Sequence, residues 1–260
     1  TCFVFALHVS GQALALAELD QSLIVVGLLR AAGGVKAWNV AAWDTSNWVP
    51  LGSGTDNQID CRAVYDNRLI AGGEFTSING LSANHVAAWD GSTWSPVGTG
   101  IAGGGSVLSL LEYDGLLIVG GWFDSAGGVA AANIAAWNGS TWSPLGSGIT
   151  GSGGTAVTSL FEYGDLLIVG GWFDSAGGGN ANNIAAWNGS TWSSLGSGMN
   201  GGVYALTVFD GDLIAGGYFS DAGGTAAEYI ASWDGATWSP LGSGTNSWVD
   251  ALTVFKTNLI

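Results

Sequence analysis

The chain has 260 residues, of which 47% are hydrophobic and 45 are Gly, and its 20 acidic and 5 basic side chains give a formal net charge of −15. The apolar fraction excludes a disordered chain, and this much Gly disfavours helices because Gly costs about 1 kcal/mol per helical site. The acidic balance argues against nucleic acid and against docking on an anionic membrane surface as partners. The sequence holds no apolar run of about 18 residues that could span a bilayer.

An internal repeat organises the whole chain. Copies begin at residues 13, 59, 107, 157, 203 and 249, which are 46 to 50 residues apart. Five copies are complete and the sixth is partial, and the third and fourth are nearly identical over residues 116–128 and 166–178. Self-similarity at this period is typical of an array of supersecondary units.

Each copy predicts four short strands, which we call a, b, c and d in chain order. In the third copy they cover residues 107–113, 116–123, 133–138 and 141–145. Asp114-Gly115 predicts the turn between strands a and b. Asn138-Gly139 predicts a tight hairpin between strands c and d, in which both residues take positive φ. No window of the sequence shows a convincing helical period.

Four antiparallel strands per repeat predict an all-β fold, a β-propeller of four-stranded antiparallel blades. Trp recurs in strands c and d of five copies, which predicts packing between neighbouring blades. These residues are Trp43, Trp48, Trp89, Trp94, Trp137, Trp142, Trp187, Trp192, Trp233 and Trp238. The third position of strand a is always small, as in Ala15, Cys61 and Ser109, which suits the innermost strand. A parallel β-helix is the main alternative, although its usual repeats are far shorter.

The repeat resembles a known family. In the third copy the apolar strand b runs into Gly120-Gly121, and Ala-Ala-Trp-Asn-Gly-Ser-Thr-Trp-Ser-Pro-Leu-Gly follows at residues 135–146. This pattern resembles the kelch repeat, and more closely the kelch-like repeats of the fungal cortical polarity-marker family and of large secreted bacterial propeller proteins. The resemblance covers essentially the whole chain and implies a kelch-like propeller. For function it implies a surface or extracellular interaction module. The first copy departs from the pattern, with Val26-Gly27 in place of Gly-Gly.

The number of blades depends on how the two ends of the chain meet. The repeat spacing matches residues 1–5 to strand d, while residues 249–260 supply strands a and b of a sixth copy. We therefore expect six blades with one incomplete, in a single propeller domain over residues 1–260 that is a fragment of a longer protein. Pairing of residues 3–7 beside residues 258–260 would support this interpretation. The alternative is a five-bladed ring with residues 249–260 outside it.

Residues suited to catalysis are scarce. His8 and His85 form no His-x-x-x-His motif and the chain has no Cys-x-x-Cys motif, so the sequence predicts no metal site, no cofactor and no nucleophile. Three Arg residues are too few for a sialidase-like carboxylate site. Most acidic residues, such as Asp66, Asp114 and Asp234, stand in turns, where bonds from the side chain to the backbone explain them. We predict no catalytic residues and no enzyme activity, although twenty acidic residues leave the paired carboxylates of a glycoside hydrolase open.

Candidate binding residues stand where the copies differ without breaking the fold. The residue before the recurrent Phe of strand b varies between copies, and it points to the face opposite that Phe. Acidic residues follow in the next loop. The candidates are Glu74, Trp122, Asp124, Trp172, Asp174, Tyr218 and Asp221. Trp and Asp on exposed loops are typical of sugar binding, and the alternative is that Trp122 and Trp172 pack against the next blade.

Strand a offers a second place where charges interrupt apolar or small positions. Asp60, Arg62 and Asp250 could line the axial channel, or Arg62 could pair with Asp60.

Taken together, the sequence favours a non-enzymatic binding module of a secreted or cell-surface protein, with a protein or glycan ligand. It predicts no nucleic-acid partner and no membrane insertion, and it leaves the oligomeric state open. The alternatives are the propeller domain of a carbohydrate-active enzyme and a structural spacer.

Overall fold

The computed structural model describes residues 9–19 and 21–260. The regular secondary structure in these two ranges consists of β-strands. The all-β prediction is therefore confirmed for the described residues. No helix in these two ranges is long and apolar enough to cross a membrane.

Five antiparallel sheets, which we call blades, follow one another along the chain, and each is built on four strands in a row. Blade 1 has the order β1 (Val9–Leu19), β2 (Ser22–Ala32), β4 (Val40–Trp43) and β5 (Trp48–Pro50), and β3 (Val35–Lys36) also pairs with β2. Blade 2 has the order β6 (Ile59–Tyr65), β7 (Arg68–Gly73), β10 (Val86–Trp89) and β11 (Trp94–Pro96). Blade 3 has the order β13 (Ser106–Tyr113), β14 (Leu116–Trp122), β17 (Ile134–Trp137) and β18 (Trp142–Pro144).

The next two blades repeat this order. Blade 4 consists of β20 (Ala156–Tyr163), β21 (Leu166–Trp172), β24 (Ile184–Trp187) and β25 (Trp192–Ser194). Blade 5 consists of β26 (Val203–Phe209), β27 (Asp212–Gly217), β30 (Ile230–Trp233) and β31 (Trp238–Pro240). The sixth copy begins with a two-stranded hairpin of β32 (Val254–Phe255) and β33 (Asn258–Leu259). The predicted strands a to d are thus confirmed in each of the five complete copies.

Small hairpins fill the connections between strands b and c. They are β8 (Ser77–Ile78) with β9 (Leu81–Ser82), β15 (Ser125–Ala126) with β16 (Val129–Ala130), β22 (Ser175–Ala176) with β23 (Gly179–Asn180), and β28 (Asp221–Ala222) with β29 (Thr225–Ala226). In two copies the chain entering the blade adds a third strand, β12 (Ile101–Ala102) or β19 (Ile149–Thr150). In blades 3 and 4 the Gly-Gly pair after Ser-Ala makes the turn of this hairpin, with φ of 62° and 79° at Gly127 and Gly128.

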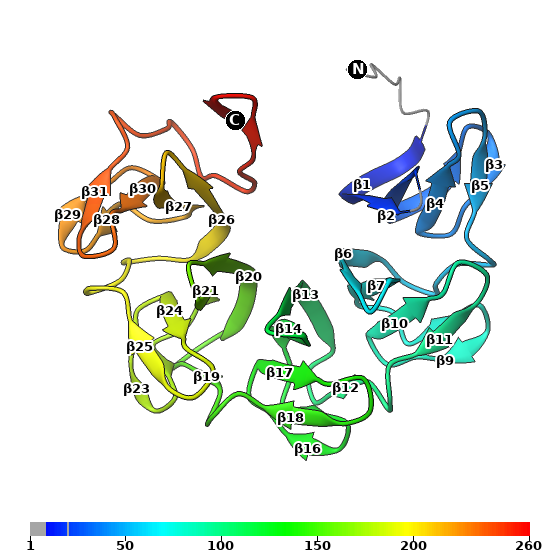
Figure 1. The fold of residues 1–260 in the computed structure, drawn as a ribbon, viewed down its shortest axis with the longest axis horizontal. Coiled ribbons are helices and arrows are strands. Elements are labelled where there is room, and N and C mark those ends of the chain that lie inside the picture. The colour runs from blue at the N-terminus through cyan, green and yellow to red at the C-terminus, as the bar shows by residue number, and fades with distance from the viewer. Residues whose placement is uncertain (1–8, 20) are drawn as a thin grey trace.

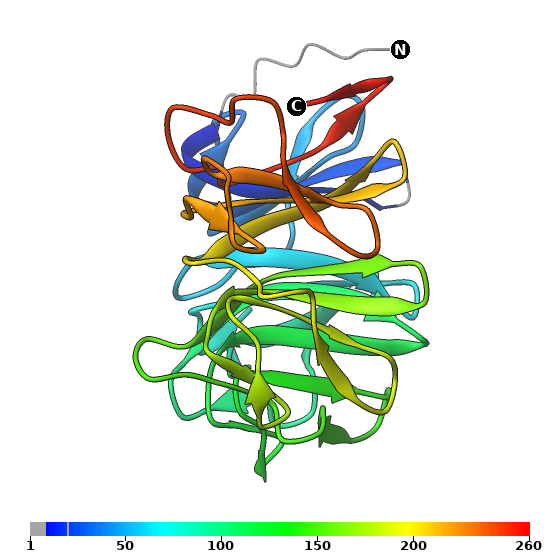
Figure 2. The same cartoon turned by 90° about the vertical axis from the view of Figure 1, so that its left-hand side faces the viewer.

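The blades are arranged radially, with strand a innermost and strand d outermost (Figure 1). Viewed from the side, the strands of successive blades are stacked (Figure 2). The described residues form an open arc, and β1 and the β32–β33 hairpin lie on either side of its opening. The predicted pairing of residues 3–7 with residues 258–260 involves residues outside the described part of the chain. Six blades and five blades both stay open as predictions.

The core lies between the blades. One apolar cluster combines Ile70 and Val86 of blade 2 with Val107 and Leu117 of blade 3. The first Gly of the double Gly in strand b makes such contacts possible, because a Cβ on Gly72 would lie 2.5 Å from Cγ1 of Val107 in the next blade, and one on Gly120 would lie 2.4 Å from Cγ1 of Val157. Neighbouring blades therefore approach each other more closely than any side chain at this position would allow.

The second Gly of the pair faces a bulge in strand a. A Cβ on Gly121 would lie 2.1 Å from the carbonyl oxygen of Ser106, and the pairing register shifts between Val107 and Ser109. The same shift occurs between Val203 and Ala205 in blade 5. A bulge leaves one residue of strand a outside the regular ladder and turns its side chain in a new direction.

The recurrent Trp residues pack at the outer part of each blade. Trp137 and Trp142 have ring centroids 5.2 Å apart within blade 3, and a Cβ on Gly98 of the preceding connection would lie 2.9 Å from both rings. The indole Nε1 of Trp142 donates a hydrogen bond to the carbonyl oxygen of Val97 at 3.3 Å. The predicted packing of these Trp residues between blades is therefore confirmed, and it explains the Gly that follows strand d.

The hairpin between strands c and d differs from the prediction. Gly139 has a φ of 91°, but Asn138 is not among the residues with positive φ. Asn138 Oδ1 instead accepts hydrogen bonds from the backbone N–H groups of Ser140 and Thr141, at 2.9 and 2.8 Å. The prediction of two positive φ values was wrong here because the Asn side chain closes the turn, as Asx turns do. Both residues have positive φ at Asp114-Gly115.

Candidate functional site

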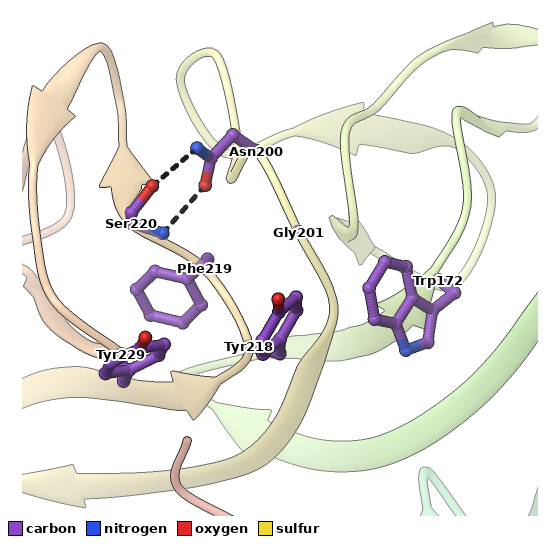
Figure 3. Close-up of a pocket in the computed structure, with 7 residues that line it drawn as sticks. All are labelled: Trp172, Asn200, Gly201, Tyr218, Phe219, Ser220 and Tyr229. Atoms are coloured by element: carbon purple, nitrogen blue, oxygen red, sulfur yellow. Dashed lines mark hydrogen bonds between the residues drawn. The ribbon is translucent and has the colours of Figure 1, made fainter. Parts of the chain in front are cut away.

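A cavity of about 220 Å³ lies between blades 4 and 5, at the end of the molecule where strands b finish. Figure 3 shows the residues around it. They are Trp172, Asn200, Gly201, Tyr218, Phe219, Ser220 and Tyr229. Three of these residues belong to the chain directly after β27, so the cavity is mainly a feature of blade 5 with one wall from blade 4.

Five aromatic rings contact one another at this cavity, three of them in its lining and two beside those three, and we call them the aromatic cluster. They are Trp172, Tyr204, Tyr218, Tyr229 and Trp248. Tyr218 is central: its ring centroid lies 6.2 Å from Trp172, 6.3 Å from Tyr229 and 5.7 Å from Trp248. Trp172, Tyr218 and Trp248 are 37%, 48% and 56% exposed. Large rings that touch one another yet remain this exposed form an apolar surface facing solvent.

Local structure places each ring of the cluster. Phe219 is buried in the core, so the alternation of a strand turns its neighbour Tyr218 outward. Tyr204 is the residue that the bulge of β26 leaves outside the ladder, and its ring centroid lies 6.3 Å from that of Trp172. Gly202 allows this approach, because a Cβ there would lie 2.3 Å from the Trp172 ring. Trp172 thus packs against the next blade and also lines the cavity.

The polar side of the cavity is fixed by a small hydrogen-bond network. Asn200 Oδ1 accepts hydrogen bonds from the N–H groups of Ser220 and Asp221, at 2.9 and 3.0 Å, and Asn200 Nδ2 donates to Ser220 Oγ at 3.0 Å. This network joins the connection between blades 4 and 5 to the chain after β27, and it holds the polar groups of the cavity in place.

Asp174 and Asp221, two of the predicted acidic candidates, have local hydrogen-bond partners. Asp174 Oδ2 accepts hydrogen bonds from the N–H and the hydroxyl of Ser152, both at 2.7 Å, and these bonds lower the pKa of Asp174. Asp221 lies in β28 rather than in a loop, and its Oδ1 accepts a hydrogen bond from Gly224 N–H at 3.0 Å. Asp124 is exposed on the corresponding loop of blade 3.

The structure brings two of the predicted residues, Trp172 and Tyr218, into one cavity. Trp122 lies on blade 3, where it is 57% exposed. Glu74 lies on blade 2 and accepts a hydrogen bond from Asn57 Nδ2 at 3.3 Å. The seven candidates therefore lie on four successive blades, and only Trp172 and Tyr218 of them line the cavity.

Sequence reasoning missed Asn200, Tyr204, Ser220, Tyr229 and Trp248. The copies carried a signal for two of them. Tyr229 occupies the position held by Asn133 in blade 3 and by His85 in blade 2, so it breaks a repeat rule in the same way as Tyr218. Trp248 stands outside the two recurrent Trp positions.

Charged residues of strand a form a separate group on blade 2. Burial and the nearby negative charge of Glu74 raise the pKa of Asp60 to about 6, against the opposing effect of a hydrogen bond from Gln58. Arg62 Nε donates a hydrogen bond to the carbonyl oxygen of Leu16 at 2.6 Å, which links blade 2 to blade 1. The described residues show no ion pair between Arg62 and Asp60. They also contain no group of three or more His, Cys, Asp or Glu side chains placed to hold a metal ion.

Comparison with known proteins supports the architecture. A family model described as "Domain of unknown function (DUF5122) beta-propeller" matches residues 66–87, which include β7 and the hairpin that follows it. The fold is a β-propeller. A search of curated protein sequences finds no match to this chain.

Several solved structures resemble the propeller. A computationally designed protein, Ika8, has a TM-score of 0.59 and 18% identity, over 95% of this chain and 66% of that one. The extracellular domain of a putative hybrid two-component system from B. thetaiotaomicron has a TM-score of 0.52 and 10% identity, over 95% of this chain and 36% of that one. A chain of the mitotic checkpoint complex has a TM-score of 0.50 and 13% identity, over 91% and 66% of the two chains. The propeller thus spans less than two thirds of the first two structures, and these likenesses concern the fold.

Proposed function

We propose that this propeller is a non-enzymatic interaction module that binds its ligand at the aromatic cluster. The observation that carries the proposal is the exposure of Trp172 and Tyr218 in the lining of a cavity, with the exposed Trp248 against Tyr218. Such rings contribute most to stability when they are buried. Aromatic residues are enriched where proteins bind partners, and Trp and Tyr often supply most of the binding energy. Binding in this cavity would cover apolar surface that the free protein leaves in water.

The ligand class that we propose is a protein or a glycan. A net charge of −15 disfavours nucleic acid, because phosphates attract Lys and Arg residues that this chain largely lacks. We place the module on a secreted or cell-surface protein. The resemblance of the repeats to those of surface and secreted proteins supports this location, as does the extracellular setting of one structural neighbour.

Two finer features of the architecture belong to the same proposal. We propose that the repeats are of the kelch-like type, which the double Gly of strand b and the paired Trp residues of strands c and d support. We also propose six blades with one incomplete. Val249 of the sixth copy supports this count, because it packs on Gly216 of blade 5 just as Val157 packs on Gly120 of blade 3.

One observation favours a second function, the propeller domain of a carbohydrate-active enzyme. Asp60 has a pKa raised to about 6 and feels the charge of Glu74, and glycoside hydrolases use one carboxyl with a raised pKa beside an ionised one. This pair lies on blade 2, away from the aromatic cluster. Turnover of a bound glycan that is lost in the variant Asp60→Asn would favour the enzyme over the binding module.

Arrays of purified glycans and of purified peptides provide the test, with fluorescently labelled wild type and the double variant Trp172→Ala/Tyr218→Ala. We expect at least one ligand that binds wild type and is lost by the double variant, and mass spectrometry should recover it chemically unchanged. The variant Trp38→Ala removes an exposed Trp of blade 1 and should bind as wild type does. Absence of any bound ligand would contradict the proposal and favour a structural spacer.

A further inference from the structure

The cavity at the aromatic cluster is lined without a single charged side chain. Its polar groups are the side chains of Asn200 and Ser220, the two tyrosine hydroxyls and the backbone at Gly201. A cavity meant for a cation would be expected to place a carboxylate in the lining, and one meant for an anion would place Arg or Lys there. This lining contains neither a carboxylate nor a basic side chain, although the chain as a whole carries 20 acidic side chains.

The neutral polar groups lie together on one side of the rings. Figure 3 shows the hydroxyl groups of Tyr218 and Tyr229 on the side of the Asn200–Ser220 pair. Neither hydroxyl makes a hydrogen bond to another residue in the described ranges, whereas Tyr65, Tyr113 and Tyr163 each donate one to a backbone carbonyl of the next blade. The two hydroxyls at the cavity therefore remain available to a ligand as donors and acceptors.

A ligand that matches this lining has an apolar face for the rings and neutral hydroxyl groups for the polar side. A pyranose ring has both, since its axial C–H groups form an apolar face and its hydroxyls lie around the edge. The cavity volume of about 220 Å³ lies below the roughly 300–1,000 Å³ typical of pockets for drug-sized molecules, so it suits one small ring. From these observations we propose that the aromatic cluster binds a neutral glycan, with one pyranose unit in the cavity.

The ring arrangement extends this site beyond one sugar unit. Trp248, in the connection just before the sixth copy, stands edge-on to Tyr218, with an interplanar angle of 65° and ring centroids 5.7 Å apart. On the other side, Trp122 occupies in blade 3 the position that Trp172 occupies in blade 4, and it is more than half exposed. Exposed rings on successive blades along one end of the propeller fit an extended chain of sugars, with the strongest contact at Tyr218 and a weaker one at Trp122.

This inference rests on the proposed function and narrows its ligand from a protein or a glycan to a neutral glycan. The probes are three neutral hexasaccharides, of β-1,4-linked glucose, mannose and N-acetylglucosamine, titrated into the protein while its Trp fluorescence is recorded. We expect at least one to bind, Tyr218→Ala and Trp172→Ala each to weaken that binding about tenfold or more, and Trp122→Ala to weaken it less. Trp38→Ala is the matched control and should leave the affinity unchanged.

Thermal unfolding followed by circular dichroism shows whether each variant folds. Tyr218→Phe provides a second test that keeps the ring, and it should weaken binding about threefold to tenfold by removing one hydrogen bond to the sugar. Failure of all three hexasaccharides to bind, or equal affinity for wild type and both alanine variants, would overturn the glycan inference.

A fourth probe separates this failure from failure of the module itself. A lysine-rich peptide of similar length tests whether the rings bind a cation through their faces, as aromatic cages do. Binding of the peptide alone, lost in Trp172→Ala, would overturn the glycan inference and leave the interaction module in place.

Discussion

Gly120 of blade 3 and Val157 of blade 4 are packed so closely that a Cβ on Gly120 would lie 2.4 Å from Cγ1 of Val157. Equivalent pairs join Gly72 to Val107, at 2.5 Å, and Gly170 to Val203, at 2.7 Å. The double Gly of strand b thus acts between blades, through its first member. Because each blade is stabilised mainly by its neighbours, this contact is a sensitive point for the stability of the array.

We expect Gly120→Ala to lower the free energy of unfolding by about 1–3 kcal/mol, as overpacking of a dense core does. Gly153→Ala is the matched control, because Gly153 is exposed, has open space around it and has no left-handed φ. Its effect should stay within about 0.5 kcal/mol. Urea unfolding followed by circular dichroism measures both, and equal stability of the two variants would contradict the close approach of the blades.

The indole hydrogen bond between blades makes a second prediction. Trp94 is buried, and its Nε1 donates to the carbonyl oxygen of Leu51 in the preceding connection at 2.9 Å. Trp94→Phe removes the donor and leaves that carbonyl without its partner, which should cost about 1–3 kcal/mol beyond the lost packing. Trp89→Phe alters the other ring of the same pair, 5.4 Å away, which donates no such bond to a described residue. Thermal unfolding should therefore show a clearly larger loss for Trp94→Phe, and equal losses would mean that ring volume alone matters.

Much of the architecture could be predicted from the sequence because the same physical constraint recurs in every copy. Trp137 and Trp142 stand for positions repeated in five copies, and Gly120-Gly121 for a pair repeated in four, so each interpretation could be checked against the other copies. The c–d turn was mispredicted for a physical reason. Its Asn closes the turn through its side chain, which a dipeptide rule on φ does not describe.

The site was harder to predict because it depends on what differs between copies. Trp172 and Tyr218 were found as variable positions on strand b, but the rings that join them come from strands a and c and from the connection before the sixth copy. Tyr204 reaches Trp172 because a bulge turns its side chain out of the ladder. The sequence pattern of strand a shows where Tyr204 is, but it does not show this change of direction.

A buried Asn at the start of strand c provides a third prediction. Asn133 has a φ of 61°, its Oδ1 accepts a hydrogen bond from Phe123 N–H at 3.2 Å, and its Nδ2 donates to Ile149 O at 2.8 Å. Asn133→Ala should cost about 2–4 kcal/mol, since two buried backbone groups lose their partners and Ala is strained at this φ. Asn133→Gly loses the same bonds without the strain and should cost about 1 kcal/mol less. Chemical unfolding of both variants checks this order, and the reverse order would contradict it.

The raised pKa of Asp60 predicts how stability varies with pH. Burial and the charge of Glu74 place this pKa at about 6 in the folded protein, against about 3.9 in an unfolded chain. Below pH of about 4 the carboxyl is protonated in both states, and its contribution to stability is fully present. As the pH rises through about 6, the folded state holds the proton more tightly than the unfolded state, so this contribution is lost.

Asp60→Asn removes the titration and keeps an oxygen for the hydrogen bond from Gln58. The variant should therefore match wild type near pH 4 and become more stable above pH 7, by about 1 kcal/mol, because Asp60 is only partly shielded from solvent. Glu74→Gln removes the second cause of the raised pKa and should give a smaller gain over the same range. Thermal unfolding of the three proteins between pH 4 and 8 measures these differences. A gain for Asp60→Asn that did not change with pH would show that the substitution acts through packing and not through the charge.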